Sequence, residues 1–312
     1  MTLLSLLIVM ALERVTNKSK QFHIATLAES YFNILINREY VKERPNMLAS
    51  VMLALIPALL LYIVLSWLPI LAVFIANVFV LWVCLGCPVT RKTYKQYLQA
   101  AHREDFQACA LHSMSFGNEG GALSNVGKQL VLVNYRQYAS VILFFILLGA
   151  PGVVFYSLVK EWAVQQKKRA EQNVLTMNDD TSDEDDAQPS APTQEEIEAK
   201  LSANKEVTPL APNDSAVNKL LFIIDWIPVR ITAFGFLVVG HFTNAMSAWF
   251  EILLNPSIST YDALAKVSKA AEDVSTMDEH LTEPLQLVKL VKRNVVFILM
   301  SVSLLTMVGL VA

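Results

Sequence analysis

Between Pro45 and Thr90 the chain reads PNMLASVMLALIPALLLYIVLSWLPILAVFIANVFVLWVCLGCPVT, and this stretch contains no Asp, Glu, Lys, Arg or His. A helix needs about 20 apolar residues to cross the hydrocarbon core of a bilayer. The stretch is therefore long enough for two crossings, and Trp67-Leu-Pro69 lies midway as an uncharged turn. The sequence predicts a membrane hairpin at residues 48–89.

Two further uncharged runs are long enough to cross a membrane, Gln137–Val159 and, only just, Asn294–Ala312. With 54% hydrophobic residues and a mean hydropathy of +0.42, the 312-residue chain differs from soluble globular proteins. We therefore expect an all-α, polytopic integral membrane protein with about four transmembrane helices and amphipathic helices in its loops. A further apolar segment, Ile231–Phe250, either re-enters the membrane or forms a fifth crossing.

The N-terminal membrane half, residues 1–165, is expected to contain an apolar N-terminal helix, the hairpin and a third span at residues 138–159. Gly149-Ala-Pro-Gly interrupts this third span. Proline and glycine are tolerated in membrane helices where neighbouring groups satisfy the freed carbonyls. Either a kink beside a cavity or ordinary packing explains the interruption.

The C-terminal membrane half, residues 213–312, is expected to contain a segment at 216–250 that Pro228 breaks, and a last span at residues 294–312. One group of basic residues precedes this half and another precedes the last span, and each is typical of a loop on the cytoplasmic side. The topology is therefore ambiguous, and it depends on whether the segment that follows Pro228 crosses fully or re-enters.

The region between the two halves, residues 166–212, is acidic. Nine of the 28 acidic residues lie between Asp179 and Glu198, a window without Lys or Arg. The formal net charge of −3 becomes −3 + 9 = +6 outside that window, as expected for loops beside an anionic leaflet. The region has too little apolar content to offset the entropy of ordering, so we expect a disordered linker. The sequence contains no basic patch interleaved with aromatic residues, so we do not expect nucleic-acid binding.

Neither the cysteines nor a glycine-rich stretch predicts a cofactor. Cys84, Cys87 and Cys109 make no disulfide framework, and a zinc site would need two more ligands, so we interpret them as core thiols. The stretch Gly117–Lys128 has one residue too many for a phosphate-binding loop and lacks the hydroxyl residue after its lysine. We interpret it as a connector and predict no metal and no cofactor.

A polar group lies at the mouth of the apolar C-terminal segment, in Asp225-Trp-Ile-Pro-Val-Arg230. Proline suits the first turn of a helix and disfavours a helical residue before it. Pro228 therefore predicts a helix start, with Arg230 in the first turn, where a cation opposes the helix dipole unless an anion is present. On an unbroken helix His241 would share the face of Arg230, because eleven residues make about three turns.

Three anions could pair with Arg230: Asp225, Glu13, or a ligand phosphate or carboxylate held by the guanidinium and free amides. Charged groups at membrane depth cost roughly 2.5 to 3.5 kcal/mol each on insertion scales, so they are usually paired or functional. A structural pair of Asp225 with Arg230 and a ligand site are the two alternatives. Glu13, Arg14 and His241 could join the ligand site.

Four segments of the chain together resemble the AmpE family. They are Leu-Glu13-Arg14, Val133-Asn-Tyr-Arg136-Gln-Tyr, Asp225-Trp-Ile-Pro-Val-Arg230-Ile and His241-Phe-Thr-Asn-Ala-Met-Ser-Ala-Trp249-Phe. The resemblance covers nearly the whole chain, although the acidic insert is longer than the family usually carries. It implies a multi-pass protein of the bacterial inner membrane that takes part in regulating β-lactamase induction alongside a cytosolic muropeptide amidase.

AmpE proteins are similar in turn to the CobD/CbiB cobalamin-synthesis proteins, which join an aminopropanol moiety to a corrinoid carboxyl group. Leu148–Tyr156 and Ile227-Pro-Val-Arg-Ile resemble segments of that larger group. The acidic and asparagine residues that the group places before the third span are replaced here by Asn134-Tyr-Arg136-Gln-Tyr. The resemblance implies, as an alternative function, an amide-forming membrane ligase with Asp225 or Glu13 as acid or base.

Our first hypothesis is an inner-membrane modulator of cell-wall or β-lactam response signalling that binds a small anionic ligand between membrane helices. A structural partner for another membrane protein is a third alternative. The expected partners are the lipid bilayer, the small anionic ligand and a membrane or cytosolic signalling protein. The candidate ligand-binding residues are Glu13, Arg14, Asn134, Arg136, Asp225, Arg230 and His241.

Overall fold

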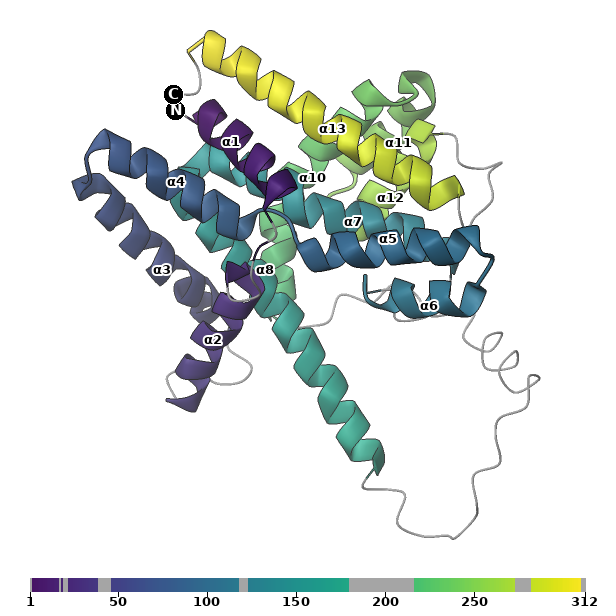
Figure 1. The fold of residues 1–312 in the computed structure, drawn as a ribbon, viewed down its shortest axis with the longest axis horizontal. Coiled ribbons are helices and arrows are strands. Elements are labelled where there is room, and N and C mark those ends of the chain that lie inside the picture. Colours follow the sequence, from purple (N-terminus) through teal and green to yellow (C-terminus); the bar gives the residue numbers. More distant parts are fainter. Residues whose placement is uncertain are drawn as a thin grey trace.

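A computed structural model describes residues 2–16, 18, 22–38, 46–117, 123–179, 216–272 and 282–309 of the chain. Every regular element in these ranges is helical, so the expected all-α fold class is confirmed (Figure 1). The elements are α1 (Thr2–Val15), α2 (Ile24–Asn37), α3 (Met47–Trp67), α4 (Ile70–Cys84), α5 (Pro88–His102), α6 (Phe106–Met114), the 3-10 turn η2 (Leu123–Asn125), α7 (Val126–Asn134), the π-helical segment η3 (Tyr135–Ala139), α8 (Ser140–Asp179), α10 (Ala216–Val239), α11 (Phe242–Leu254), α12 (Thr260–Glu272) and α13 (Thr282–Met307).

Helices α3 and α4 form the hairpin that the charge-free stretch predicts. Helix α3 ends at Trp67, and α4 begins at Ile70 directly after Pro69, which caps its N-terminus. The large apolar side chains of both helices are widely exposed, Trp67 to 86%. An apolar surface of this extent marks contact with something other than water, and for helices of this length and composition that is lipid.

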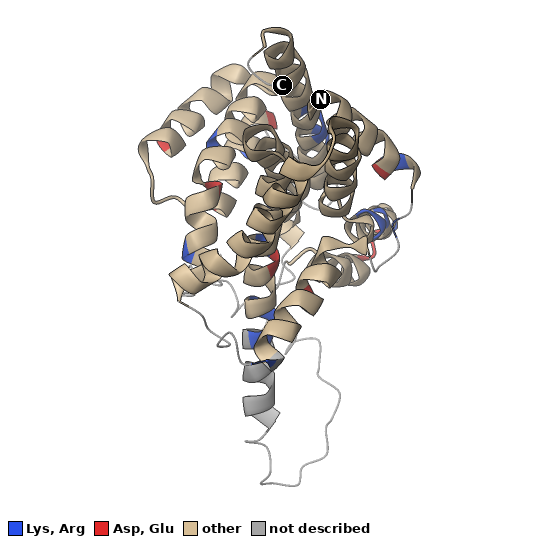
Figure 2. Cartoon of the chain, turned by 90° about the vertical axis from the view of Figure 1, so that its left-hand side faces the viewer, with Lys and Arg blue, Asp and Glu red and all other residues tan. Residues whose placement is uncertain are grey.

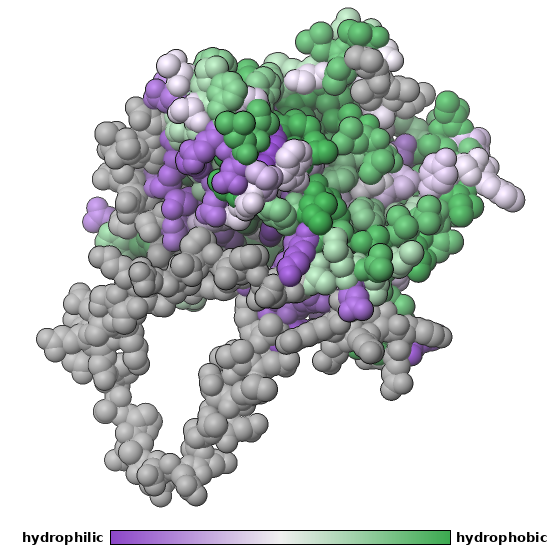
Figure 3. Space-filling model, turned by 180° about the vertical axis from the view of Figure 1, so that it is seen from behind, coloured by the Kyte–Doolittle hydropathy of each residue, from purple (hydrophilic) through white to green (hydrophobic). Residues whose placement is uncertain are grey.

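Five helical segments among the described residues are long and apolar enough to cross a membrane. They are Met47–Trp67, Ile70–His102, Val126–Arg169, Ala216–Val239 and Thr282–Met307. Charged positions are sparse along these helices (Figure 2), and Figure 3 shows hydrophobic residues gathered over a wide area of one face with hydrophilic residues grouped to one side. The chain is therefore a multi-pass membrane protein.

The segment Val126–Arg169 turns back on itself. Gly149 has φ +68° and ψ −160°, a backbone conformation that is essentially restricted to glycine. The rings of Phe144 and Tyr156 stack with their centroids 4.6 Å apart, although twelve residues of straight helix would separate them by about 18 Å. The predicted interruption is thus a reversal. We call residues 126–148 the first arm and residues 150–169 the second arm.

The second arm lies in the main hydrophobic core. Trp162 and Tyr156 are almost fully buried, and the Trp162 ring lies 4.2 Å from the ring of Phe32 in α2, centroid to centroid. Helices α3, α4 and α10 pack against α8 as well. A smaller apolar cluster around Tyr97 and Phe116 attaches α5 and α6 to α7 and α13. The long helices are therefore arranged around the reversed segment.

The expected helix start at Pro228 is wrong. Helix α10 runs from Ala216 to Val239 with Pro228 inside it, and the break comes at Gly240, whose added Cβ would meet the Ala271 carbonyl and methyl. Because α11 begins after this break, Arg230 and His241 do not share a helix. Pro228 and Val229 are buried, and packing outweighs the local preference of proline for a first turn.

Two expected boundaries also differ. The last helix begins at Thr282, twelve residues before the expected span at 294, because Leu287, Leu290 and Val291 are buried and extend its apolar face. Helix α8 continues to Asp179, so the first residues of the expected linker 166–212 are helical. Residues 180–215 lie outside the described ranges, as do residues 118–122 of the glycine-rich stretch.

Candidate functional site

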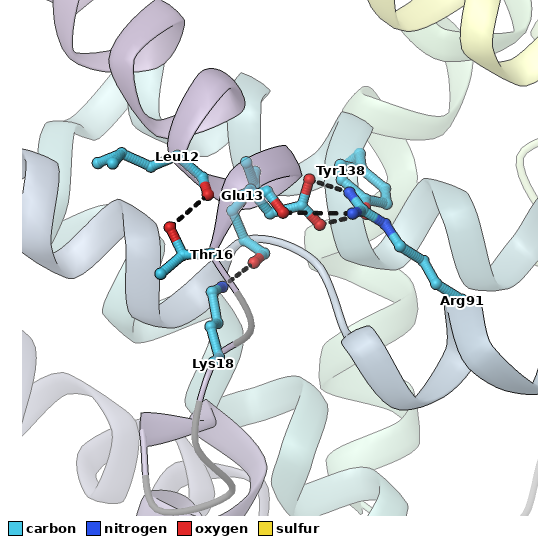
Figure 4. A network of polar contacts seen from close by, with 7 residues as sticks. Leu12, Glu13, Thr16, Lys18, Arg91 and Tyr138 are labelled. Atoms are coloured by element: carbon cyan, nitrogen blue, oxygen red, sulfur yellow. Dashed lines mark hydrogen bonds and ion pairs between the residues drawn. The ribbon is translucent and has the colours of Figure 1, made fainter.

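The first group of polar side chains, which we call the Glu13 cluster, consists of Glu13, Arg91 and Tyr138 (Figure 4). The Arg91 guanidinium pairs with Oε2 of Glu13 and donates to the Glu13 backbone carbonyl at 3.3 Å. The Tyr138 hydroxyl donates to Oε1 of Glu13 at 2.8 Å and accepts from Arg91 at 3.1 Å. The Glu13 side chain is 5% exposed and that of Arg91 is 42% exposed, so the cluster joins a buried carboxylate to the surface.

The backbone around α4 and α5 is shaped to admit this carboxylate. Gly86 has φ +71°, and a Cβ there would collide with Oε1 of Glu13 and lie 3.0 Å from the Tyr138 hydroxyl. The Gly86 N–H donates to the Gln137 carbonyl at 3.2 Å, and the Gln137 amide donates to the Thr90 hydroxyl at 3.0 Å. The Lys18 ammonium donates to the Leu85 carbonyl. These contacts tie α1, α4 and η3 together.

Lys18 lies outside the candidate spans, and burial lowers its pKa while the nearby Glu13 carboxylate acts in the opposite direction. Each oxygen of the Glu13 carboxylate has a donor, and the cations beside it have acceptors. A buried ion pair whose members are all hydrogen-bonded rigidifies a structure. The Glu13 cluster is therefore built as a structural junction between helices.

The second group, which we call the Asp225 cluster, consists of Asp225 of α10, Tyr135 and Arg136 of η3, and Tyr156 of the second arm. Asp225 is 0% exposed, and its Oδ1 accepts a hydrogen bond from the Tyr135 hydroxyl at 2.9 Å. Arg136 and Lys160 attract the carboxylate electrostatically, and the Tyr156 hydroxyl lies beside it. The cluster is thus assembled from both arms of the reversed segment and α10.

Unlike the Glu13 cluster, the Asp225 cluster contains buried polar atoms without a hydrogen-bond partner. Oδ2 of Asp225, Nε of Arg136 and the Tyr156 hydroxyl lack a partner in full hydrogen-bond geometry, although the Tyr156 hydroxyl lies close enough to the Asp225 carboxylate to interact with it. Leaving such an atom unpaired in a protein interior costs about 1 to 3 kcal/mol, and more for a charged group. Intramembrane ionisable residues with this cost are candidates for function. The cluster therefore contains a carboxylate oxygen and a guanidinium N–H that are both buried and incompletely paired.

The π-helical segment η3 connects the two clusters. Tyr135 and Tyr138 are three residues apart, yet the first contacts Asp225 and the second contacts Glu13. A π-helical turn inserts one residue relative to an α-helix and rotates the side chains beyond it by about 100°, and such segments occur frequently at functional sites. Ser140 supports the segment by donating to the Tyr135 carbonyl at 3.1 Å.

Arg230 has a different environment from the one expected. Its guanidinium donates to the carbonyls of Ile252 and Asn255 at 3.1 Å each and to the Trp226 carbonyl at 3.0 Å, and it lies 3.9 Å from the centre of a Trp226 ring. Ile252 and Asn255 are at the C-terminal end of α11. Carbonyls at a helix C-terminus carry partial negative charge and are stabilised by cations. They are the partner of Arg230.

The structure thus brings together only part of the predicted ligand-binding set. Arg14 and His241 are exposed, and the Asn134 amide donates to the Leu130 carbonyl at 2.8 Å within its own helix. Arg136 and Asp225 share one cluster, whereas Glu13 and Arg230 occupy separate places. Sequence reasoning missed Arg91 and three tyrosines at 135, 138 and 156. A pair of tyrosines three residues apart beside Arg136, at the mouth of an apolar run, was the available signal.

Comparisons with known proteins give the family. The chain matches the family model described as regulatory signalling modulator protein AmpE over residues 1–177 and 198–312. It is 22% identical over 238 residues to Protein AmpE of Shigella flexneri, covering 72% of this chain and 71% of that protein. No solved structure matches the chain. The similarity to CobD/CbiB proteins stays a prediction. The chain therefore belongs to the AmpE family of regulatory signalling modulators.

Proposed function

We propose that the protein modulates a cell-wall or β-lactam response from within the bacterial inner membrane, and that the Asp225 cluster is its ligand site. The ligand is a small molecule with an anionic group for Arg136 and a hydrogen-bond donor for Asp225. Family membership supports the signalling role. The location of the site differs from the sequence-based expectation, because both carboxylate oxygens of Glu13 are paired and Arg230 donates to three backbone carbonyls, although Nε of Arg230 is also buried without a partner.

One observation carries this proposal: Oδ2 of Asp225 and Nε of Arg136 are both buried and both unpaired, within the same cluster. A charged acceptor and a charged donor in this state are each stabilised by a ligand that supplies the complementary group. The resulting gain in binding energy is available for signalling only if the ligand favours one conformation over another. The element that differs between these two conformations is the π-helical segment η3, which connects the two clusters.

Substitution of the two charged residues tests the proposal. In cells that lack their own copy, Asp225→Asn and Arg136→Gln are expected to abolish the change in β-lactamase induction that the wild-type protein produces, while accumulating in the membrane at wild-type levels. Glu272→Gln is the matched control, because it removes a carboxylate that pairs with Arg293 outside the cluster. Tyr135→Phe provides a milder variant that removes one hydrogen bond to Asp225.

Binding is measured on purified protein in detergent, with soluble fragments released from peptidoglycan by a muramidase as the probe. The fragments are expected to raise the melting temperature of the wild-type protein and the Glu272→Gln control but not that of the two cluster variants. An induction response that persists in accumulated Asp225→Asn and Arg136→Gln proteins would show that the cluster is not the ligand site.

A further inference from the structure

The first arm reaches the level of the end of α4 at Gln137 and Tyr138, which we take as its base. The Gly86 N–H, two residues beyond α4, donates to the Gln137 carbonyl. Arg91, at the start of α5, donates to the Tyr138 hydroxyl. The first arm therefore enters the apolar region on the side where α4 leaves it, which is opposite to the turn Trp67–Pro69.

The base of the second arm lies at the level of the start of α3. Leu158, Val159 and Trp162 line a shallow apolar pocket together with Ser50 and Ala54 of α3. Ser50 is in the first turn of α3, so this contact is on the same side as the end of α4. Both arms thus begin on the side that carries the two ends of the α3–α4 hairpin, and neither base lies near its turn.

The reversed segment is too short to reach the other side. Between its contact with α3 at Val159 and the reversal at Ala150, the second arm has ten of its twenty residues, which span about 15 Å. From Ser50 to Trp67, α3 has eighteen residues, which span about 27 Å, close to the thickness of a bilayer core. Leu147 and Leu148 at the reversal are 63% and 60% exposed, as expected for a tip that ends among lipid chains.

We infer that the segment Val126–Arg169 is a re-entrant helical hairpin rather than a span, and that the Asp225 cluster at its base is reached from the cytoplasm. Basic residues flank the side where both arms begin, at Arg91, Lys92 and Lys95 and at Lys167–Arg169. The stretch from Met47 to Cys84 has none, and an excess of Lys and Arg marks cytoplasmic loops. The re-entrant topology stands independently, whereas the cytoplasmic origin of the ligand rests on the proposed function.

Cysteine labelling tests this topology in the full-length protein. In a background with Cys84, Cys87 and Cys109 replaced by alanine, single cysteines are introduced by Ser66→Cys, Ser115→Cys, Leu148→Cys and Lys168→Cys, all at exposed positions. A membrane-impermeant maleimide is then applied to spheroplasts and to inverted membrane vesicles. The cysteines at 115 and 168 are expected to react only in inverted vesicles, the one at 66 only in spheroplasts, and the one at 148 only after detergent is added.

Two outcomes would overturn the inference. Labelling at 115 and 168 from opposite faces would make the segment a single crossing. Reaction at 148 from the same side as 66 would make it two full crossings. If the cysteine-free background does not accumulate, specific-protease sites inserted after Ser115 and after Pro192 of the otherwise natural chain give the same comparison. The labelling pattern is independent of β-lactamase induction, so failure of the topology and failure of the proposed ligand site are distinguishable.

Discussion

At the residue scale, Glu13 and Asp225 are both buried carboxylates, but their surroundings differ. Glu13 has a cation, a hydroxyl and a close glycine, so each of its oxygens is paired. Asp225 has one paired oxygen and one unpaired oxygen. A fully satisfied polar group contributes rigidity, and an unsatisfied one is held in place by the surrounding fold at a cost. This difference supports the proposed ligand role of Asp225 and a structural role for Glu13.

Gly86→Ala is expected to destabilise the protein by more than Gly309→Ala. Both glycines have positive φ, +71° and +78°, so each alanine incurs the backbone penalty of about 1 to 2 kcal/mol. Only at residue 86 does the added Cβ also meet Glu13, because nothing lies within 4 Å of it at residue 309. Melting temperatures of the purified variants compare the two costs, and equal losses would contradict the close approach of Glu13.

Acidification is expected to weaken the attachment of α2. Burial, with a smaller contribution from Lys18, lowers the pKa of His23 below its usual value. Below about pH 6.5 the unfolded segment binds a proton that the folded one resists, so stability decreases as the pH falls. Hydrogen exchange of α2 amides, corrected for the intrinsic rate, should be faster at pH 5.5 than at pH 7.5. In His23→Gln this pH dependence should disappear, and its persistence would point to another group.

At the scale of elements, α10 shows how packing changes the meaning of a residue. Pro228 removes a backbone donor, yet α10 continues through it because Pro228, Val229 and Thr232 are buried against neighbouring helices. The Thr232 hydroxyl donates to the Pro228 carbonyl at 2.8 Å. A proline inside a helix is tolerated in apolar surroundings when side chains or neighbouring helices satisfy the backbone groups that it leaves unpaired. Because α10 is not interrupted between them, Asp225 and Arg230 lie on different faces of the helix, about 140° apart.

Arg230→Ala is expected to reduce the free energy of unfolding by about 2 to 3 kcal/mol, since it removes hydrogen bonds from a charged group to three carbonyls. Arg230→Lys should recover only part of the loss, because an ammonium cannot replace the planar donor arrangement. Denaturation of the purified protein in detergent measures both changes.

Asp225 and Arg230 have separate partners and lie on different faces of α10, so they do not pair directly. A charge-swapped double variant, Asp225→Arg with Arg230→Asp, should therefore be no more stable than the sum of the two single variants implies. Restoration of stability by the swap would show that the two side chains pair after all.

At the scale of the whole molecule, the family match leaves out residues 178–197, which include most of the acidic window. The matched parts contain all the helices described here except the last residues of α8. Both clusters lie within these matched parts. The structure that supports the candidate site is thus shared with the family, and the insert is additional to it.

Deleting residues 180–197 is therefore expected to leave membrane accumulation and β-lactamase induction unchanged, because the family match includes the residues of both clusters and omits that stretch. Immunoblots of membrane fractions and induction assays check this in cells. A variant with the acidic residues of the window changed to Asn and Gln separates the effect of charge from that of length. A changed response in either variant would assign a regulatory role to the insert.

The sequence by itself determined the membrane class, the α3–α4 hairpin and its turn, because the absence of charge over 45–90 is a local property that only a bilayer or a core can accommodate. It also identified Gly149-Ala-Pro-Gly as an interruption and Asp225 as a charged residue at the mouth of an apolar segment, whereas Arg136 entered the candidate set with a segment that resembles the AmpE family. The tertiary structure decided that Gly149 reverses the chain, that Arg230 binds the end of α11, and that two tyrosines of η3 separate the carboxylates. These outcomes depend on contacts between residues far apart in the chain, which local periodicity and propensity do not contain.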